Sequence, residues 1–275
     1  MADVITQFKT TELDAINEIL ASVGQGPVTT LDDTNPDVAI IQRTLKQVSK
    51  EVQSEGWSFN KEFQTKNVLQ PQKTADWVKN TVYKIGDTVM NDGNLYECTT
   101  AGTSENDATK GPTGTGSGIT DNQAKWQFII VGNKTKIVVT DNILQADLSD
   151  PLRDYDPVVR WDDDLNKRIL YDRANHTDRW DATKDWEWDV TFFYNFLSLP
   201  AVVQDYIVAR SATTVSSRIV GDMGQYQILQ QKEAYCRAMS LEYECSQGDY
   251  TFFGHSKNKT KNYYDSYKPY LALER

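Results

Sequence analysis

Histidine is almost absent from this sequence: among 275 residues only His176 and His255 occur. Most catalytic triads and histidine-rich metal sites need imidazoles in patterns that two separate histidines do not provide, so the sequence argues against both classes. Cysteine is also scarce, and the odd set Cys98, Cys236 and Cys245 does not make a disulfide framework, which favours folding in a reducing cytoplasm. No apolar run approaches the roughly 18 residues that a membrane-spanning helix needs, so we expect no membrane span.

Basic residues are also in deficit. The 29 lysines and arginines face 39 acidic residues, which leaves a formal net charge of −10. A protein that wraps nucleic acid needs a surplus of cations on part of its surface, so this balance argues against that function. The deficit is uneven, because residues 147–189 contain 13 acidic and seven basic side chains, whereas 254–275 contain two acidic and five basic ones.

Helical signals are concentrated at the two ends of the sequence. Thr11 and Asp14 form a capping-box pattern, and Asn35 followed by Pro36 combines an N-cap residue with a favoured first helical residue. The apolar spacing predicts helices over 11–24, 36–55, 200–218 and 222–246. In the last of these helices the predicted buried band consists of Ile228, Leu229, Tyr235, Cys236, Met239 and Tyr243.

The middle of the sequence is β-like. The span 76–130 holds seven of the 15 glycines, and its alternating segments flank an Asp92-Gly93 turn signal. This pattern predicts a small three-stranded β-module. A second β region is predicted over 131–195, in which residues 162–166 form the turn of a hairpin.

Together these signals predict an α+β protein, with a bundle of about four helices, a β-sheet region and a small all-β insertion domain. The core is expected to be discontinuous, over 1–75 and 131–275, with 76–130 inserted into it. The segment 254–275 combines basic residues with Tyr263, Tyr264, Tyr267 and Tyr270. We interpret this segment as a C-terminal arm that docks on another surface.

Few patterns in the sequence point to catalysis. The glycine-rich loop 111–118 lacks the Lys-Ser or Lys-Thr ending of a phosphate-binding loop, and the aspartates 162–164 lack the spacing of a calcium loop. A pair of carboxylates could still hydrolyse a glycosidic bond, but 39 acidic residues offer too many pairs to single one out. We therefore nominate no catalytic, cofactor-binding or metal-binding residue, and we expect no enzyme and no cofactor.

Aromatic residues are the notable feature of the 76–130 module. Trp77, Tyr83, Tyr96 and Trp126 are concentrated in a short span. Exposed aromatic rings can stack on sugar faces, and a module of this size also needs aromatic side chains as a miniature core. The sequence leaves two interpretations open: a contact with a glycan or with another protein, and a core.

Several segments of the sequence resemble the tail tubular protein A family, the adaptor proteins of short-tailed bacteriophages. The resemblance is carried by Leu13-Asp-Ala-Ile-Asn-Glu-Ile-Leu-Ala-Ser-Val-Gly24, by Glu51-Val-Gln-Ser-Glu-Gly-Trp-Ser-Phe-Asn60, and by Leu199-Pro200, Tyr206-Ile207, Ala209-Arg210 and Glu242-Tyr243-Glu244. The 76–130 span departs from simpler members. It resembles carbohydrate-binding modules of the chitin-binding type through Trp77, Tyr83-x-x-Gly86-Asp87-x-Val89, Gly93, Tyr96 and Trp126.

The family resemblance implies a structural role in the virion tail for a protein made in the host cytoplasm. Family members form a twelve-membered ring that joins the portal protein to the tubular tail nozzle, offers attachment sites to tail fibres, and lets DNA pass during ejection without specific binding. An acidic subunit suits such a conduit because negative walls repel phosphates. The alternatives are a glycan-binding tail component that contacts host surface glycan through the 76–130 module and, less favoured, a cell-wall glycan hydrolase.

Overall fold

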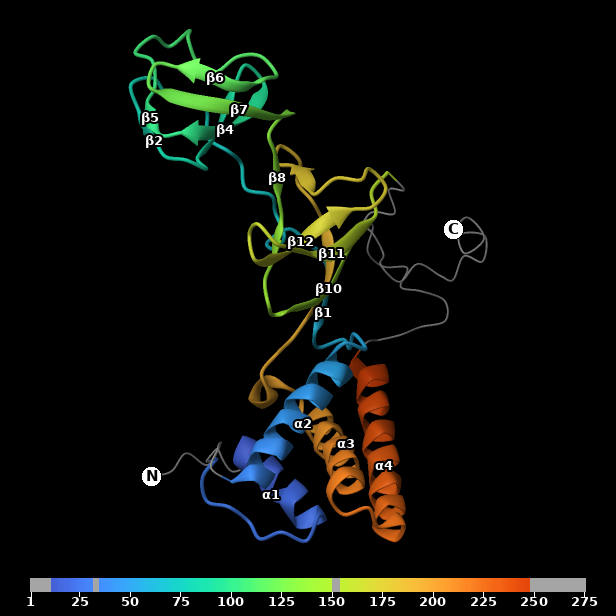
Figure 1. Ribbon diagram of the computed structural model, residues 1–275. Helices are drawn as coiled ribbons and strands as arrows, with labels where there is room; N and C mark the ends of the chain where they lie inside the picture. The colour runs from blue at the N-terminus through green and yellow to red at the C-terminus, as the bar shows by residue number, and fades with distance from the viewer. Residues whose placement is uncertain (1–10, 32–34, 150–153, 248–275) are drawn as a thin grey trace, which may run out of the picture. The chain divides into compact units, whose positions relative to one another are not determined.

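The computed structural model describes residues 11–31, 35–149 and 154–247, and these residues form two compact units (Figure 1). The helical unit comprises Met1–Glu62 and Thr191–Arg275, and the β unit comprises Phe63–Val190. The sequence grouped the β region 131–195 with the helices in one discontinuous core. In the structure this region, up to Val190, belongs to the same unit as the 76–130 span. Within the described residues no helix combines the length and the apolar character needed to cross a membrane.

The four predicted helices are present in the helical unit, and their starts follow the expected signals. They are α1 (Glu12–Ser22), α2 (Pro36–Gln53), α3 (Ala201–Ile219) and α4 (Met223–Gln247). Thr11 and Asp14 form the capping box: the Asp14 amide donates to the Thr11 hydroxyl (3.1 Å), and the Thr11 amide donates to the Asp14 carboxylate (3.1 Å). At α2, the Asn35 side chain accepts from the Asp37 amide (3.0 Å), and Pro36 is the first helical residue.

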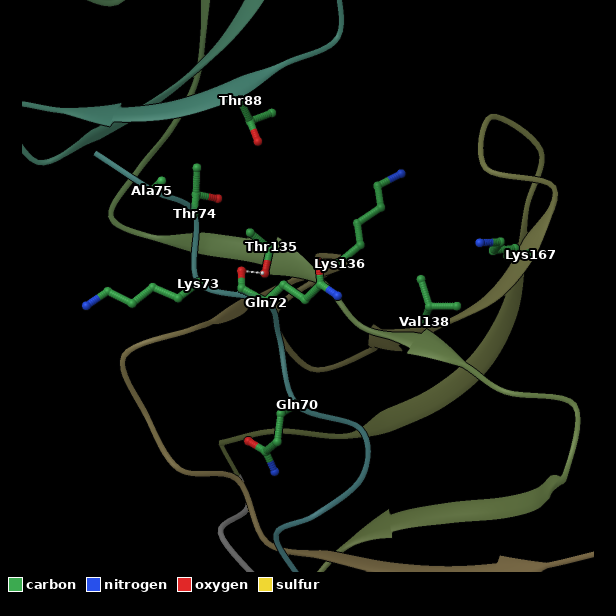
Figure 2. A pocket seen from close by; sticks show the side chains of 10 residues that line it. All are labelled: Gln70, Gln72, Lys73, Thr74, Ala75, Thr88, Thr135, Lys136, Val138 and Lys167. Atoms are coloured by element: carbon green, nitrogen blue, oxygen red, sulfur yellow. Dashed lines mark hydrogen bonds between the residues drawn. The ribbon is translucent and has the colours of Figure 1, made fainter. Parts of the chain in front are cut away.

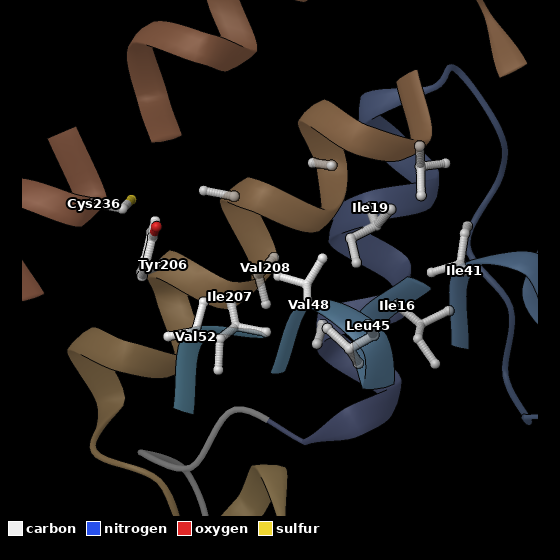
Figure 3. Packing of buried hydrophobic residues seen from close by; sticks show 14 of the residues in the cluster. Ile16, Ile19, Ile41, Leu45, Val48, Val52, Tyr206, Ile207, Val208 and Cys236 are labelled. Carbon is white, nitrogen blue, oxygen red and sulfur yellow. The ribbon is translucent and has the colours of Figure 1, made fainter. Parts of the chain in front are cut away.

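The core of the helical unit is aliphatic and joins three of its helices. Figure 3 shows Ile16 and Ile19 of α1 facing Leu45 and Val48 of α2, with Ile207 of α3 beside them, and each of these five side chains is at most 3% exposed. Side chains of this kind stabilise a fold by about 1.5–3 kcal/mol each when they are fully buried. The helical unit therefore has a substantial core of its own.

The predicted buried band of the last helix is wrong for three of its six residues, whereas Cys236 is buried as predicted and Leu229 packs against the core. Ile228, Tyr235 and Met239 of α4 are 69%, 66% and 38% exposed, and the only buried residues of this helix are Cys236 and Ser240. α4 lies side by side with α3 (Figure 1) and turns its smaller side chains inward. The reason is close approach: the Ser240 hydroxyl donates to the backbone carbonyl of Val202 at 2.9 Å, which leaves the larger apolar residues on the outside.

The β unit consists of several small antiparallel sheets. The predicted hairpin is confirmed: β11 (Pro157–Asp162) pairs with β12 (Lys167–Asp172), the pair Asp162 and Lys167 closes the turn, and β12 also pairs with β9 (Val138–Val139). The other sheets contain β8 (Lys134–Lys136) with β13 (Arg179–Asp181), and β1 (Lys61–Thr65) with β14 (Trp188–Phe192) and β10 (Ile143–Leu148).

The 76–130 span contains more strands than the three that were predicted. Its main sheet has four strands in the order β3-β4-β7-β6, and a second sheet pairs β2 with β5. The strands are β2 (Val82–Tyr83), β3 (Thr88–Asn91), β4 (Asn94–Thr100), β5 (Gly102–Thr103), β6 (Ser117–Asp121) and β7 (Ala124–Val131). Asp92 and Gly93 form the predicted turn with positive φ values of 47° and 74°. β6 was not predicted, and it begins within the glycine-rich loop. Gly118, with a φ of 72°, lies at an irregularity in the strand pairing between Ser117 and Ile119.

Candidate functional site

The four aromatic residues proposed from the sequence form the core of the 76–130 module. Trp77, Tyr83, Tyr96 and Trp126 are 9%, 8%, 0% and 0% exposed, and they belong to one buried cluster. Tyr83 packs edge-on against Trp126, with ring centroids 4.9 Å apart. Rings that are buried in this way have no free face for a sugar, so the burial supports the core interpretation that the sequence left open.

A buried carboxylate orients the two indole rings of this core. Asp121 is 2% exposed and accepts from the indole nitrogens of Trp77 (2.8 Å) and Trp126 (3.0 Å), and also from the Glu105 amide (2.7 Å). Each indole has a single donor group, so these bonds satisfy both rings completely. Asp121 was not predicted, because it lies 44 residues from Trp77 and carries no local signal.

The two tyrosines of the module are held by backbone groups. The Tyr83 hydroxyl accepts from the Val78 amide (2.8 Å), and the Tyr96 hydroxyl donates to the Gly114 carbonyl (2.9 Å). Burial raises the pKa of Tyr83 above its ordinary value of 10.0. These contacts tie the β2 segment and the 111–118 loop to the sheet, so both tyrosines have structural roles.

The exposed apolar side chains of the module lie elsewhere. Val78, Val82 and Ile85 are 55%, 70% and 71% exposed within one eight-residue segment. The sequence analysis missed them because alternation in a short strand does not tell which face is covered. The other proposed contact residues, Tyr263, Tyr264, Tyr267 and Tyr270, lie outside the described residues.

The triple aspartate forms a structural turn. Asp162 is 7% exposed and accepts from the amides of Asp164 and Leu165, both at 3.0 Å, while the Lys136 ammonium group forms an ion pair with it. The hydrogen bond from Lys136 lowers the pKa of Asp162 below its ordinary value of 3.8. The ammonium group also contacts Asp178 at 3.0 Å. Among the described residues no group of three or more His, Cys, Asp or Glu side chains is placed to hold a metal ion.

A polar cavity of about 500 Å³ lies in the β unit (Figure 2). One wall is the segment 70–75, and the others come from β3, β8, β9 and β12. The residues that line it are mostly amides, hydroxyls and lysines: Gln70, Gln72, Lys73, Thr74, Ala75, Thr88, Thr135, Lys136, Val138 and Lys167. Sequence reasoning did not find this cavity, because its lining comes from five separate segments.

The outer side of α4 exposes several large apolar side chains. In addition to Ile228, Tyr235 and Met239, the side chains of Met223 and Leu241 are 69% and 45% exposed. The charged residues that α4 exposes are Lys232, Arg237 and Glu242. Lys232 and Arg237 form ion pairs with Glu18 and Glu55, whereas Glu242 has no ion-pair partner among the described residues. Exposed Met and Tyr side chains are typical of the core of protein interfaces.

A family model described as Tail tubular protein matches residues 13–102 and 118–250, which is most of the chain. The chain belongs to the tail tubular protein family. Members of this family are structural proteins, so this tail tubular protein is a structural component of a phage virion tail. No individual curated protein matches the sequence.

The family match also bears on the 76–130 module. The match is interrupted only at residues 103–117, so it extends through much of the span that the sequence had set apart. The interruption includes most of the glycine-rich loop, which leads into β6. Residues 103–117 lie between the two matched ranges, and residues 1–12 and 251–275 lie outside the match as well. The resemblance of the module to carbohydrate-binding modules stays a prediction.

Proposed function

We propose that this tail tubular protein is a head-to-tail adaptor that assembles into a closed ring, of twelve copies as the resemblance implies. The ring joins the portal protein to the tail nozzle, carries attachment sites for tail fibres and forms part of the conduit for DNA ejection. Closed rings arise when one heterologous interface repeats around an axis. Each copy then needs two complementary surfaces. The observation that supports the proposal is the exposed face of α4, which fits one of these surfaces.

The α4 face, defined here as Met223, Ile228, Tyr235, Met239 and Leu241, fits a contact between subunits. The outer side of a water-exposed helix is usually lined by polar and charged side chains. The large exposed apolar side chains are instead spread along α4 from Met223 to Leu241, a span of about five turns. We infer that a neighbouring copy covers this face in the ring.

The acidity of the chain supports the role as a conduit. With a net charge of −10 on each copy, a closed ring accumulates a strongly negative field. Phosphates that pass through such a ring find few cations to hold them, because affinity for DNA depends on displacing its counterions with lysine and arginine. The proposal therefore requires passage of DNA without specific binding.

We further propose that the 254–275 arm docks on an acidic surface of a neighbouring tail protein or copy. Its five basic and two acidic residues complement the surplus of acidic residues in 147–189. Tyrosine side chains combine apolar area with a hydroxyl group, which suits them to protein interfaces.

Substitution on α4 tests the ring directly. We expect the double variant Ile228→Glu/Tyr235→Glu to stay folded, because both side chains are exposed, and to remain monomeric where the parent protein forms rings. Ile40→Glu on α2 is the matched control, because Ile40 is 43% exposed and belongs to another helix. Mass photometry measures the size distribution, and rings that persist in the α4 variant would refute the role of this face.

Electron microscopy of the virion tests the position of the protein. The expected result is density for this chain as a ring between portal and nozzle. If the chain is found only at the tips of fibres, the adaptor function is wrong, whatever the purified protein does in solution.

A further inference from the structure

The polar cavity of the β unit has an electrostatic character that is unusual for this protein. Lys73, Lys136 and Lys167 line it and no carboxylate does, although acidic residues outnumber basic ones in the chain. The charge of Lys136 is compensated by its two ion pairs with Asp162 and Asp178. Lys73 and Lys167 have no ion-pair partner within the part of the chain that the structure describes. Two lysines therefore leave uncompensated positive charge at the cavity.

Uncharged polar groups without partners surround this charge. The hydroxyls of Thr74 and Thr88 and the side-chain amide of Gln72 make no hydrogen bond within the described residues. Ala75 and Val138 are the only apolar residues in the lining, and both are small. A cavity with this lining offers hydrogen bonds to a hydroxylated ligand and little surface to an apolar one.

The wall that carries most of these groups is fixed before a ligand binds. The side chain of Asn133 donates to the Thr74 carbonyl at 3.0 Å and accepts from the Thr74 amide at 3.1 Å. The Thr135 hydroxyl donates to the Gln72 carbonyl at 2.8 Å. These bonds hold the 70–75 segment against β8, so binding would not have to order this part of the backbone.

We propose that this cavity binds an acidic saccharide, a sugar unit whose carboxylate is held by Lys167. Figure 2 shows Lys167 on one side of the cavity and Lys73 on the opposite side, with the Lys73 ammonium group directed away from the other side chains that line the cavity. The carboxylate pairs with the Lys167 ammonium group, and the sugar hydroxyls bond to Thr74, Thr88 and Gln72. The cavity volume of about 500 Å³ lies within the usual range of about 300–1,000 Å³ for small-ligand sites.

The charge distribution favours this ligand over DNA. Duplex DNA needs a row of cations along its backbone, whereas the cavity provides two uncompensated lysines. The neighbouring aspartates 162–164 and Asp178 would repel a long polyanion. A compact ligand with a single carboxylate enters the cavity without running past these aspartates.

Isothermal titration calorimetry on the full-length protein tests the proposal. The probes are galacturonic acid, glucuronic acid and sialic acid, which carry one carboxylate each, and maltotriose, sulfate and duplex DNA are the comparisons. We expect at least one acidic probe to bind and Lys167→Gln to weaken it by about tenfold, the loss expected for one charge-assisted hydrogen bond. Lys73→Gln should weaken it by less, because the Lys73 ammonium group points away from the other lining side chains. Lys125→Gln is the matched control, since this exposed lysine of β7 lies outside the cavity, and it should leave the affinity unchanged.

Four results would overturn the proposal. The first is that no acidic probe binds, and the second and third are that maltotriose or sulfate binds as tightly as the acidic probes. The fourth is that the parent protein binds duplex DNA and the same two variants lose this binding. Circular dichroism melting establishes that both variants are folded. Ring formation is measured in parallel, because the lysine variants should assemble normally and the α4 variant should keep its affinity for the sugar. Failure of this proposal and failure of the adaptor function are thereby distinguished.

Discussion

Replacing Asp121 with alanine would remove the one acceptor shared by both tryptophans of the 76–130 module. In the parent protein its carboxylate accepts from the Trp77 indole at 2.8 Å and the Trp126 indole at 3.0 Å. Trp126 is 0% exposed and Trp77 is 9% exposed, so water has little access to either donor. The variant therefore leaves both buried indole N–H groups without a partner, and it also removes the acceptor of the part-buried Glu105 amide.

The expected cost follows from these two donors. A buried donor that loses its acceptor costs about 1–3 kcal/mol, so the pair gives about 2–6 kcal/mol. The space vacated by the carboxylate is next to the Glu105 amide, and a water molecule that enters there would replace part of the lost bonding. We expect the free energy of opening of the module to fall by about 3 kcal/mol, toward the lower part of this range.

Hydrogen exchange followed by mass spectrometry measures this change locally, whereas whole-chain fluorescence would average over seven tryptophans. A loss of about 3 kcal/mol accelerates exchange in β4 and β7 by about a hundredfold. Exchange in α2 and α3 should be unchanged. The control Asp107→Ala removes an exposed aspartate of the same module that bonds only to Thr109, and it should leave exchange in β4 and β7 as in the parent.

A double-mutant cycle can refute the reasoning itself. Trp77→Phe removes one of the two donors, so it should cost less in the Asp121→Ala background than in the parent protein. If Trp77→Phe costs the same in both backgrounds, the bond between the indole and the carboxylate contributes nothing, and the module is stabilised by ring packing alone.

Three further predictions concern other parts of the protein. Ile207→Ala, at a core position with 0% exposure, should lower the free energy of unfolding of the helical unit by about 2–5 kcal/mol in urea denaturation. Thr11→Ala should cost about 1 kcal/mol and increase exchange at the start of α1, because the side chain that caps its first turn is lost. The hydrogen bond from Lys136 lowers the pKa of Asp162, so this group stabilises the fold above its unfolded pKa, near 3.8, and the effect is lost as the pH falls further. Asp162→Asn should therefore flatten the decline in stability below pH 4 in urea titrations, and an unchanged decline would contradict this account.

The parts of the fold that were predictable are those with local signals. The capping box of Thr11 and Asp14, the Asn35-Pro36 helix start and the Asp92-Gly93 turn each depend on residues within four positions of one another. Backbone geometry and side-chain chemistry agree at such places, so the sequence predicts them well. Strand number was less predictable, because β5 and β8 have only two and three residues and no periodicity can be read from them.

The candidate sites depended on burial, which local patterns do not determine. Apolar spacing correctly placed Ile228, Tyr235 and Met239 on one stretch of helix, but spacing cannot tell whether a face is covered by the same chain. Conversely, the sequence left open whether the aromatic residues of the module form a core or a ligand contact, and their burial around Asp121 supports the core. In both cases the sequence shows which side chains are apolar or aromatic, but only the fold shows which of them are covered by other parts of the chain.

The proposed assembly face and the proposed ligand cavity should act independently of one another. The α4 face is in the helical unit and the lysine-lined cavity is in the β unit, and each unit has a core of its own. Energetic coupling between two sites requires an element whose equilibrium both of them bias. Substitutions at Tyr235 and at Lys73 replace exposed side chains and leave both cores intact, so their effects should add. A combined variant that loses more ring assembly than Tyr235→Glu alone would show instead that the cavity contributes to the contact between subunits.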